Sequence, residues 1–143
     1  MTEPPLLLLA TGRRPRLRRP ELARPKEIEL HMAVAHVLRR QARPDWKWAH
    51  YPAGEERDAK TSQKLRAMGA KRGWPDFLLF DRSGRLHALE LKRRGEGLSC
   101  DQEDFQTWCV ARGVPHAVAE TFDEALKVLS AWGALRMPIG RRA

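Results

Sequence analysis

The sequence predicts an α/β domain built on a mixed sheet of about four strands with helices on its faces. The elements follow in the order helix, strand, short helix, two strands, helix, strand and helix, and 143 residues are enough for one such domain. A tight turn joins the second and third strands, and a helix connects the third strand to the fourth, so antiparallel and parallel pairs are expected in one sheet. Charged residues (31%) and apolar residues (42%) are balanced as in water-soluble globular proteins.

The first half of the chain predicts a helix, a strand and a short basic helix. Apolar residues recur at helical spacing over 28–38, which predicts a helix over about 26–41 that ends before Pro44. The aromatic segment 46–51 is short and bounded by prolines, as is typical of a strand. Basic residues at helical spacing over 57–68 predict a short helix.

The later elements have apolar centres and turn-forming or capping residues at their ends. They are a strand over 77–80, a turn at 81–84, a strand over 86–92, a helix from Ser99 to Gly113, a strand over 116–119, and a last helix that is capped by Thr121 or Asp123 and reaches Trp132.

Positive charge is concentrated at the two ends of the chain. The formal net charge is +9, of which residues 1–26 carry +5 and residues 136–143 carry +3. We therefore expect a disordered basic arm over 1–24, a folded domain over 25–135 and a basic tail over 136–143. Such tails bind polyanions through charge, although a purely solubilising role fits them equally well.

Composition argues against several classes of protein. No run of 18 apolar residues is present, so we expect neither a membrane-spanning helix nor a membrane partner. The apolar stretch 6–10 is too short for a secretory signal and precedes the arginines. Cys100 and Cys109 are too few for a disulfide framework, and the expected location is the cytoplasm.

The third predicted strand carries two charged side chains on one face. Strand alternation places Glu90 and Lys92 on the same side, and a hairpin about residues 82–83 places Asp76 opposite roughly 89–90. Two neighbouring carboxylates attract Mg²⁺ or Mn²⁺, and an adjacent lysine can orient a water or stabilise a phosphoryl transition state. A same-face salt bridge and a turn-forming aspartate would explain the same residues without chemistry.

These residues carry a family resemblance. Gly73-Trp74-Pro75-Asp76, Glu90-Leu91-Lys92 and Ser99-x-x-Gln102 follow a first-helix glutamate, Trp48-x-His50 and Gly54-Glu55. This ordered set, spanning Glu27 to about Trp132, resembles the stand-alone VRR-Nuc proteins of phages and bacteria within the PD-(D/E)xK nuclease superfamily. The resemblance implies a restriction-endonuclease-like fold with an αβββαβ core, a nuclease domain over 25–135, and Mg²⁺- or Mn²⁺-dependent hydrolysis of DNA by water.

The resemblance also implies roles for individual residues. Asp76, Glu90 and the carbonyl of Leu91 would bind the metal, and Lys92 would position or activate the water. A first-helix glutamate would complete the site.

Two assignments at the margin of this site have ordinary structural alternatives. Helical spacing favours Glu27 over Glu29 as the first-helix ligand, although acidic residues are common in the first turn of any helix. Ser99-x-x-Gln102 has the spacing of a helix capping box, and in the family the matching glutamine also approaches the active site. Gln102 can therefore serve both purposes.

The remaining polar and aromatic residues give weaker signals. His31 and His36 lie about 140° apart around a helix, which is poor for sharing a metal, and His50 fits a polar residue at a strand end. The tryptophans are expected to anchor the core, with Trp74 as the exception.

Basic residues near the predicted site indicate DNA as the partner. Residues 57–72 contain six basic residues and one acid, more than solubility requires. The candidate phosphate contacts are Lys60, Lys64, Lys71, Arg72, Arg93 and Arg94.

The size of the chain suits a homodimeric nuclease selective for branched or flapped DNA in phage or bacterial replication, repair or recombination. The alternatives are a non-catalytic DNA-binding or packaging accessory protein, and a sequence-specific restriction enzyme.

Overall fold

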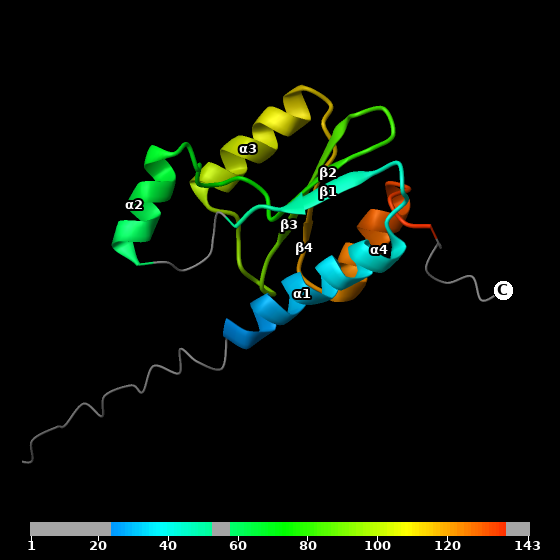
Figure 1. Cartoon of the computed structure of the whole chain (residues 1–143), viewed down its shortest axis with the longest axis horizontal. Coiled ribbons are helices and arrows are strands. Elements are labelled where there is room, and N and C mark those ends of the chain that lie inside the picture. Colours follow the sequence, from blue (N-terminus) through cyan, green and yellow to red (C-terminus); the bar gives the residue numbers. More distant parts are fainter. Residues whose placement is uncertain (1–23, 53–57, 137–143) are drawn as a thin grey trace, which may run out of the picture.

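The computed structural model describes residues 24–52 and 58–136, which form one four-stranded sheet with helices on both faces (Figure 1). The helices are α1 (Arg24–Gln41), α2 (Ala59–Ala67), α3 (Cys100–Ala111) and α4 (Phe122–Ala131), and the strands are β1 (Lys47–His50), β2 (Phe77–Phe80), β3 (Leu86–Leu91) and β4 (His116–Ala119).

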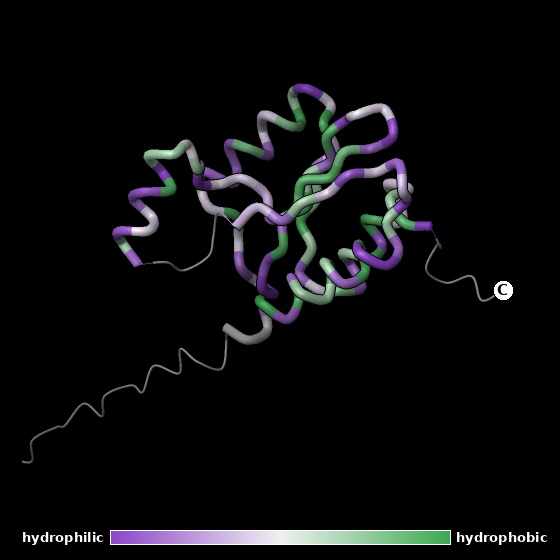
Figure 2. The backbone as a smooth tube through the Cα atoms, viewed as in Figure 1, coloured by the Kyte–Doolittle hydropathy of each residue, from purple (hydrophilic) through white to green (hydrophobic). Residues whose placement is uncertain are grey.

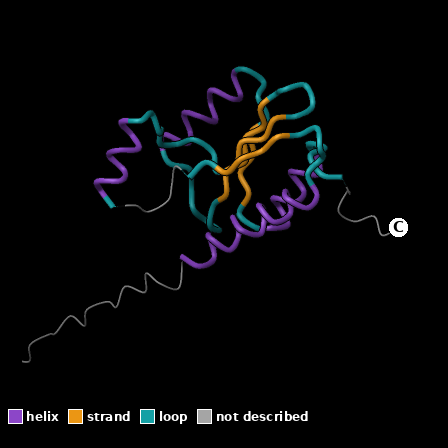
Figure 3. The backbone as a smooth tube through the Cα atoms, viewed as in Figure 1, coloured by secondary structure: helices purple, strands orange, loops and turns teal. Residues whose placement is uncertain are grey.

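The sheet has the order β1-β2-β3-β4 and contains both kinds of strand pairing. β2 is antiparallel to β1 and to β3, whereas β4 is parallel to β3 and is reached through the crossover helix α3. The predicted mixed sheet and its αβββαβ core are therefore confirmed. Figure 3 shows the strands together in the middle of the molecule, with helices on either side.

The core lies between the sheet and the pair α1 and α4. Alternate residues of β2 and β3 face these helices, and the strands are largely hydrophobic (Figure 2). The fully buried side chains that make this contact are Val34 and Leu38 of α1, Phe77 and Leu79 of β2, Leu89 and Leu91 of β3, and Leu129 of α4. Ile28, in the predicted apolar run of the first helix, is instead 60% exposed.

The helix α3 covers the other face of the sheet less completely. Cys109 is buried there, but Trp108 is 44% exposed and stacks its ring under the guanidinium of Arg112, 4.8 Å away. The expectation that Trp108 anchors the core is therefore wrong. Trp74 is 40% exposed, as expected for the tryptophan that was not predicted to anchor the core.

Element boundaries differ from the prediction by one or two residues. α1 begins at Arg24, one residue before the predicted domain start, and α2 is shorter than 57–68 because Asp58 caps it by accepting the N–H of Thr61 at 2.7 Å. The predicted arm, the predicted tail beyond Arg136, and Gly54-Glu55 lie outside the described residues. None of the helices within 24–52 and 58–136 has the length and apolar character needed to cross a bilayer.

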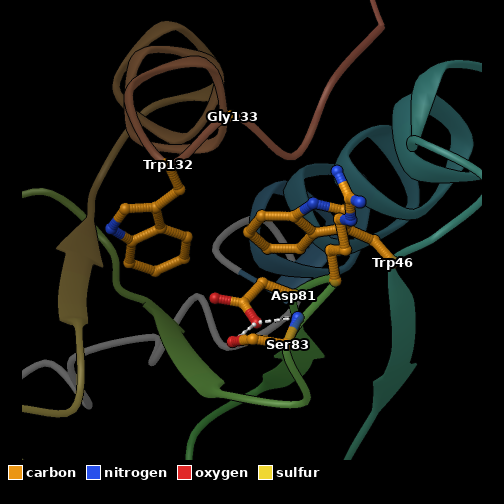
Figure 4. A pocket seen from close by; sticks show the side chains of 6 residues that line it. Trp46, Asp81, Ser83, Trp132 and Gly133 are labelled. Atoms are coloured by element: carbon orange, nitrogen blue, oxygen red, sulfur yellow. Dashed lines mark hydrogen bonds between the residues drawn. The ribbon is translucent and has the colours of Figure 1, made fainter.

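The β2–β3 hairpin turn lies at one end of the sheet and is held by Asp81. One carboxylate oxygen of Asp81 accepts the N–H groups of Ser83 and Arg85 and the hydroxyl of Ser83. A hollow of about 390 Å³ lies beside this turn, flanked by the indoles of Trp46 and Trp132 (Figure 4). The three donors that share one Asp81 oxygen hold this turn in place.

Candidate active site

Asp76 and Glu90 meet at the opposite end of the β2–β3 hairpin. Phe77 pairs with Leu89, so the next positions outward place Asp76 across from Glu90. The Asp76 carboxylate accepts the N–H of Leu91 at 2.7 Å, and its own carbonyl accepts the N–H of Tyr51 at 2.8 Å. The predicted closeness of Asp76 and Glu90 is confirmed. The Asp76 side chain links β2 to β3, so this residue does more than form a turn.

The loop that leads into β2 fixes the position of Asp76. Gly73 has φ +81°, and a Cβ there would lie 2.4 Å from the main-chain carbonyl of Asp101, in the first turn of α3. Pro75 is fully buried. Only glycine permits both the left-handed backbone and the close approach, so the chain enters β2 pressed against the start of α3.

The Glu90 side chain is buried among polar partners. The residue is 3% exposed, its Oε1 accepts the Nε2 amide of Gln102 at 2.6 Å, and Nζ of Lys92 lies 3.8 Å from the same oxygen. Burial, followed by the charge of Asp76, raises the pKa of Glu90 to about 8. Burial also raises the pKa of Asp76, against the opposing effects of His31 and the Leu91 N–H. Both carboxyls are thus held in surroundings that disfavour two negative charges.

Gln102 links this site to the start of α3. Its Oε1 accepts the N–H of Ser99 at 2.9 Å, while the Ser99 hydroxyl accepts the N–H of Gln102 at 3.3 Å. The capping box predicted from Ser99-x-x-Gln102 is therefore present. Because the same side chain donates to Glu90, the helix cap and the contact with the site coexist.

The helix α1 supplies Glu27 and His31 to a groove of about 1200 Å³ that Asp76 also lines. The carboxylate of Glu27 lies 3.2 Å from Nε of Arg93, and its charge contributes to raising the pKa of Asp76. Glu29, the alternative, is exposed and does not line this groove. The preference for Glu27 as the residue facing the site agrees with this placement, while its role as a ligand stays a prediction.

Two histidines lie beside Asp76: His50, which belongs to the motif set of the family resemblance, and His31, for which no role in the site was predicted from the sequence. Nε2 of His31 lies 3.8 Å from the Asp76 carboxylate, and Nδ1 of His50 donates to the Asp76 carbonyl at 2.8 Å. The two imidazole rings stand edge to face with centroids 5.3 Å apart. The poor spacing between His31 and His36 does not bear on this arrangement. The signal in the sequence is the spacing of four residues between Glu27 and His31, which places both on the same face of the helix.

The predicted phosphate-binding residues lie around this end of the molecule. Lys60 and Lys64 are exposed on α2, which lies on the side where α3 begins (Figure 1). Lys71 and Arg72 are exposed in the segment before Gly73, and Arg94 is exposed after β3, whereas Arg93 is half-buried beside Glu27.

The donor set suits a hard divalent cation. Carboxylate and carbonyl oxygens of Asp76, Glu90 and Leu91 are the ligands that Mg²⁺ and Mn²⁺ prefer, and the positive charge of a bound cation would offset the burial and the neighbouring negative charges that raise both pKa values. Within the described part of the chain, no three His, Cys, Asp or Glu side chains already form a group that could hold a metal. A metal held by the carboxylate pair would therefore need further ligands from the main chain, from solvent or from a nearby side chain that adjusts.

Comparison with known proteins gives one structural likeness. No protein-family model and no curated protein matches the sequence. A solved structure described as a "VRR_NUC domain" aligns with 75% of this chain and 97% of its own, with a TM-score of 0.52 and 14% sequence identity. At this identity the likeness concerns the fold. The chain therefore has the restriction-endonuclease-like α/β fold of the VRR-Nuc domains.

Proposed function

We propose that the domain over 25–135 is a nuclease that hydrolyses DNA phosphodiester bonds with Mg²⁺ or Mn²⁺ held by Asp76, Glu90 and the carbonyl of Leu91. The observation that carries this proposal is the carboxylate pair of buried Glu90 and largely buried Asp76, with Lys92 on the same face. Burying two like charges together destabilises a fold, so such a pair calls for a functional reason. The likeness of the fold to a solved VRR-Nuc domain supports nuclease chemistry for this pair.

Each side chain has a task in this reaction. The cation, when bound, neutralises phosphate charge and makes a water more acidic. Lys92, whose side chain is 11% exposed, can orient the attacking water and stabilise negative charge on the phosphoryl oxygens. Gln102 holds the Glu90 carboxylate in one orientation, and Glu27 with Arg93 lines the mouth of the groove.

The substrate is DNA selected by its shape. The exposed basic residues offer contacts to phosphates, which position a duplex without reading its sequence. A single small site must act on both strands of branched or flapped DNA, which favours a homodimer. The biological setting that fits this chemistry is phage or bacterial DNA replication, repair or recombination in the cytoplasm.

Cleavage of defined DNA structures tests the proposal. End-labelled single-stranded, duplex, flapped and four-way DNA would be incubated with the protein and Mg²⁺, Mn²⁺ or EDTA. Asp76→Asn and Lys92→Ala should each lose at least about 100-fold in rate, whereas Lys127→Ala, which removes an exposed lysine of α4, should cut normally. Binding without cutting on every substrate would instead identify a DNA-binding accessory protein.

The salt dependence of binding tests the phosphate-binding residues. Alanine replacements at Lys60, Lys64, Lys71 and Arg72 together should flatten the slope of log Kd against log salt by about 0.9 for each phosphate that the variant no longer neutralises. Fluorescence anisotropy with labelled duplex in EDTA measures this without cleavage, and Lys127→Ala is again the control. An unchanged slope in the fourfold variant would place the DNA elsewhere.

A further inference from the structure

The side of α1 that faces the groove presents two possible metal ligands one helical turn apart, Glu27 and His31. Both line the groove together with Asp76. Their surroundings differ in exposure and in partners, and this difference indicates which of them faces the ion.

Glu27 already has a partner. Its side chain is 42% exposed, and its carboxylate lies 3.2 Å from Nε of Arg93, which comes directly after Lys92 in the chain. Only Oε2 of this carboxylate lies beside the guanidinium, so an ion beside Asp76 would have to draw on its other oxygen while that contact persists. Glu27 is thus placed at the mouth of the groove, where its charge is compensated.

The His31 side chain is less exposed than that of Glu27, and its Nε2 has no hydrogen-bond partner among the described residues. The side chain is 20% exposed, while Nε2 itself is buried and makes no hydrogen bond within the described residues. The centroid of the His31 ring lies 5.3 Å from that of His50 and 6.1 Å from that of Phe77. Buried polar atoms nearly always have a partner, so a third atom is expected between His31 Nε2 and the Asp76 carboxylate.

The distance between the two atoms suits a shared ion. Nε2 of His31 and Oδ2 of Asp76 are 3.8 Å apart, too far for a hydrogen bond. Two ligand atoms that each lie about 2.1 Å from one ion are about 3.0 Å apart at right angles and about 4.2 Å apart on opposite sides. The observed separation lies between these limits.

We propose that His31 Nε2, rather than the Glu27 carboxylate, is the α1 ligand of the divalent cation bound by Asp76, an inference that rests on the proposed function. The resulting set of ligands contains one nitrogen among oxygens. Mg²⁺ binds oxygen almost exclusively, whereas Mn²⁺ also accepts imidazole. The site should therefore bind Mn²⁺ more tightly than Mg²⁺, and His31 should account for the preference.

Pulsed electron paramagnetic resonance of the Mn²⁺-loaded chain tests this assignment directly. A coordinated imidazole gives a ¹⁴N modulation of the electron spin echo. The modulation should be present in the unaltered protein and in His36→Gln, an exposed histidine of the same helix, and absent in His31→Gln. Calorimetry should show that His31→Gln weakens Mn²⁺ binding at least about tenfold, and Mg²⁺ binding less.

Several outcomes would overturn the assignment. A ¹⁴N modulation that persists in His31→Gln would place another imidazole on the ion, and its absence from the unaltered protein would leave only oxygen ligands. Loss of Mn²⁺ affinity in Glu27→Gln with His31→Gln unaffected would restore Glu27 as the ligand. Melting temperatures in EDTA check that each variant is folded.

The test also separates this inference from the proposed function. Cleavage that depends on Asp76, together with Mn²⁺ binding that lacks an imidazole signal, would reject the His31 assignment alone. Failure to bind Mn²⁺ or Mg²⁺ and to cut DNA would reject both.

Discussion

Replacing Glu90 with glutamine should stabilise the metal-free protein at alkaline pH, although the side chain is almost completely buried. Glutamine keeps the oxygen that accepts the Gln102 amide but carries no charge to be desolvated beside Asp76. The same change should remove the response of stability to metal, because it removes half of the carboxylate pair.

The size of the effect follows from the pKa of Glu90, which is about 8 in the folded protein against 4.5 in an unperturbed carboxyl. A raised pKa means that the folded state holds this proton more tightly than the unfolded state does. The protonated Glu90 side chain therefore makes its full contribution to the free energy of unfolding below about pH 4.5. This contribution is lost as the pH rises through 8. Between pH 5 and pH 8 the loss amounts to about 3 kcal/mol.

Urea denaturation in EDTA at pH 5 and pH 8 measures this directly. The unaltered protein should lose more free energy of unfolding over this interval than Glu90→Gln, by a margin of about 3 kcal/mol. Glu103→Gln, at an exposed position of α3, should behave as the unaltered protein does. Apart from the residue replaced, all three proteins contain the same titratable groups, so the difference between them reports on Glu90 and its interaction with Asp76.

Addition of Mg²⁺ or Mn²⁺ at pH 8 should then raise the melting temperature of the unaltered protein and leave that of Glu90→Gln unchanged. Equal pH dependence of the unaltered protein and Glu90→Gln would refute the reasoning, since it would mean that the Glu90 carboxylate is not destabilised by burial beside Asp76.

Two further predictions concern the elements that hold the site. Ser99→Ala removes only the helix cap and should lower the free energy of unfolding by about 1 kcal/mol. Gln102→Ala also leaves Glu90 without its amide donor and should lower it by about 2 kcal/mol, measured by urea denaturation at pH 8. Equal losses would mean that the contact with Glu90 contributes nothing to stability. Gly73→Ala combines a positive φ with a clash against Asp101 and should lower the free energy of unfolding by more than about 2 kcal/mol. Gly84 has a similar φ but open space around it, so Gly84→Ala should lower it by only about 1 kcal/mol. Similar melting temperatures for the two alanine variants would show that the loop before β2 can move away from α3.

The geometry of the carboxylate pair could be predicted because it depends on local sequence. The turn at 81–84 fixes the hairpin register, and that register places Asp76 across from Glu90 over an interval of only fourteen residues. Strand alternation then places Lys92 on the same face as Glu90. The capping box is likewise a local pattern of four residues, and it lies where the spacing predicts it.

Contacts made by α1 could not be predicted in the same way. His31 meets Asp76 only because α1 packs across the start of β2, and nothing in residues 24–41 specifies that crossing. The pairing of Glu27 with Arg93 depends on the same packing. The prediction for Trp108 is wrong because its exposure depends on how far α3 extends over the sheet, which its helical spacing does not reveal.

The double engagement of Gln102 restricts which amino acids can occupy that position. Its carbonyl oxygen serves the Ser99 N–H, and its amide serves Glu90. A glutamate could cap the helix but would set a third carboxylate against the pair, and an asparagine has one methylene too few to reach both partners. Residue 102 should therefore remain glutamine in related proteins that keep Glu90. A different residue at this position would mark a lineage in which the site has changed its ligands or lost its function.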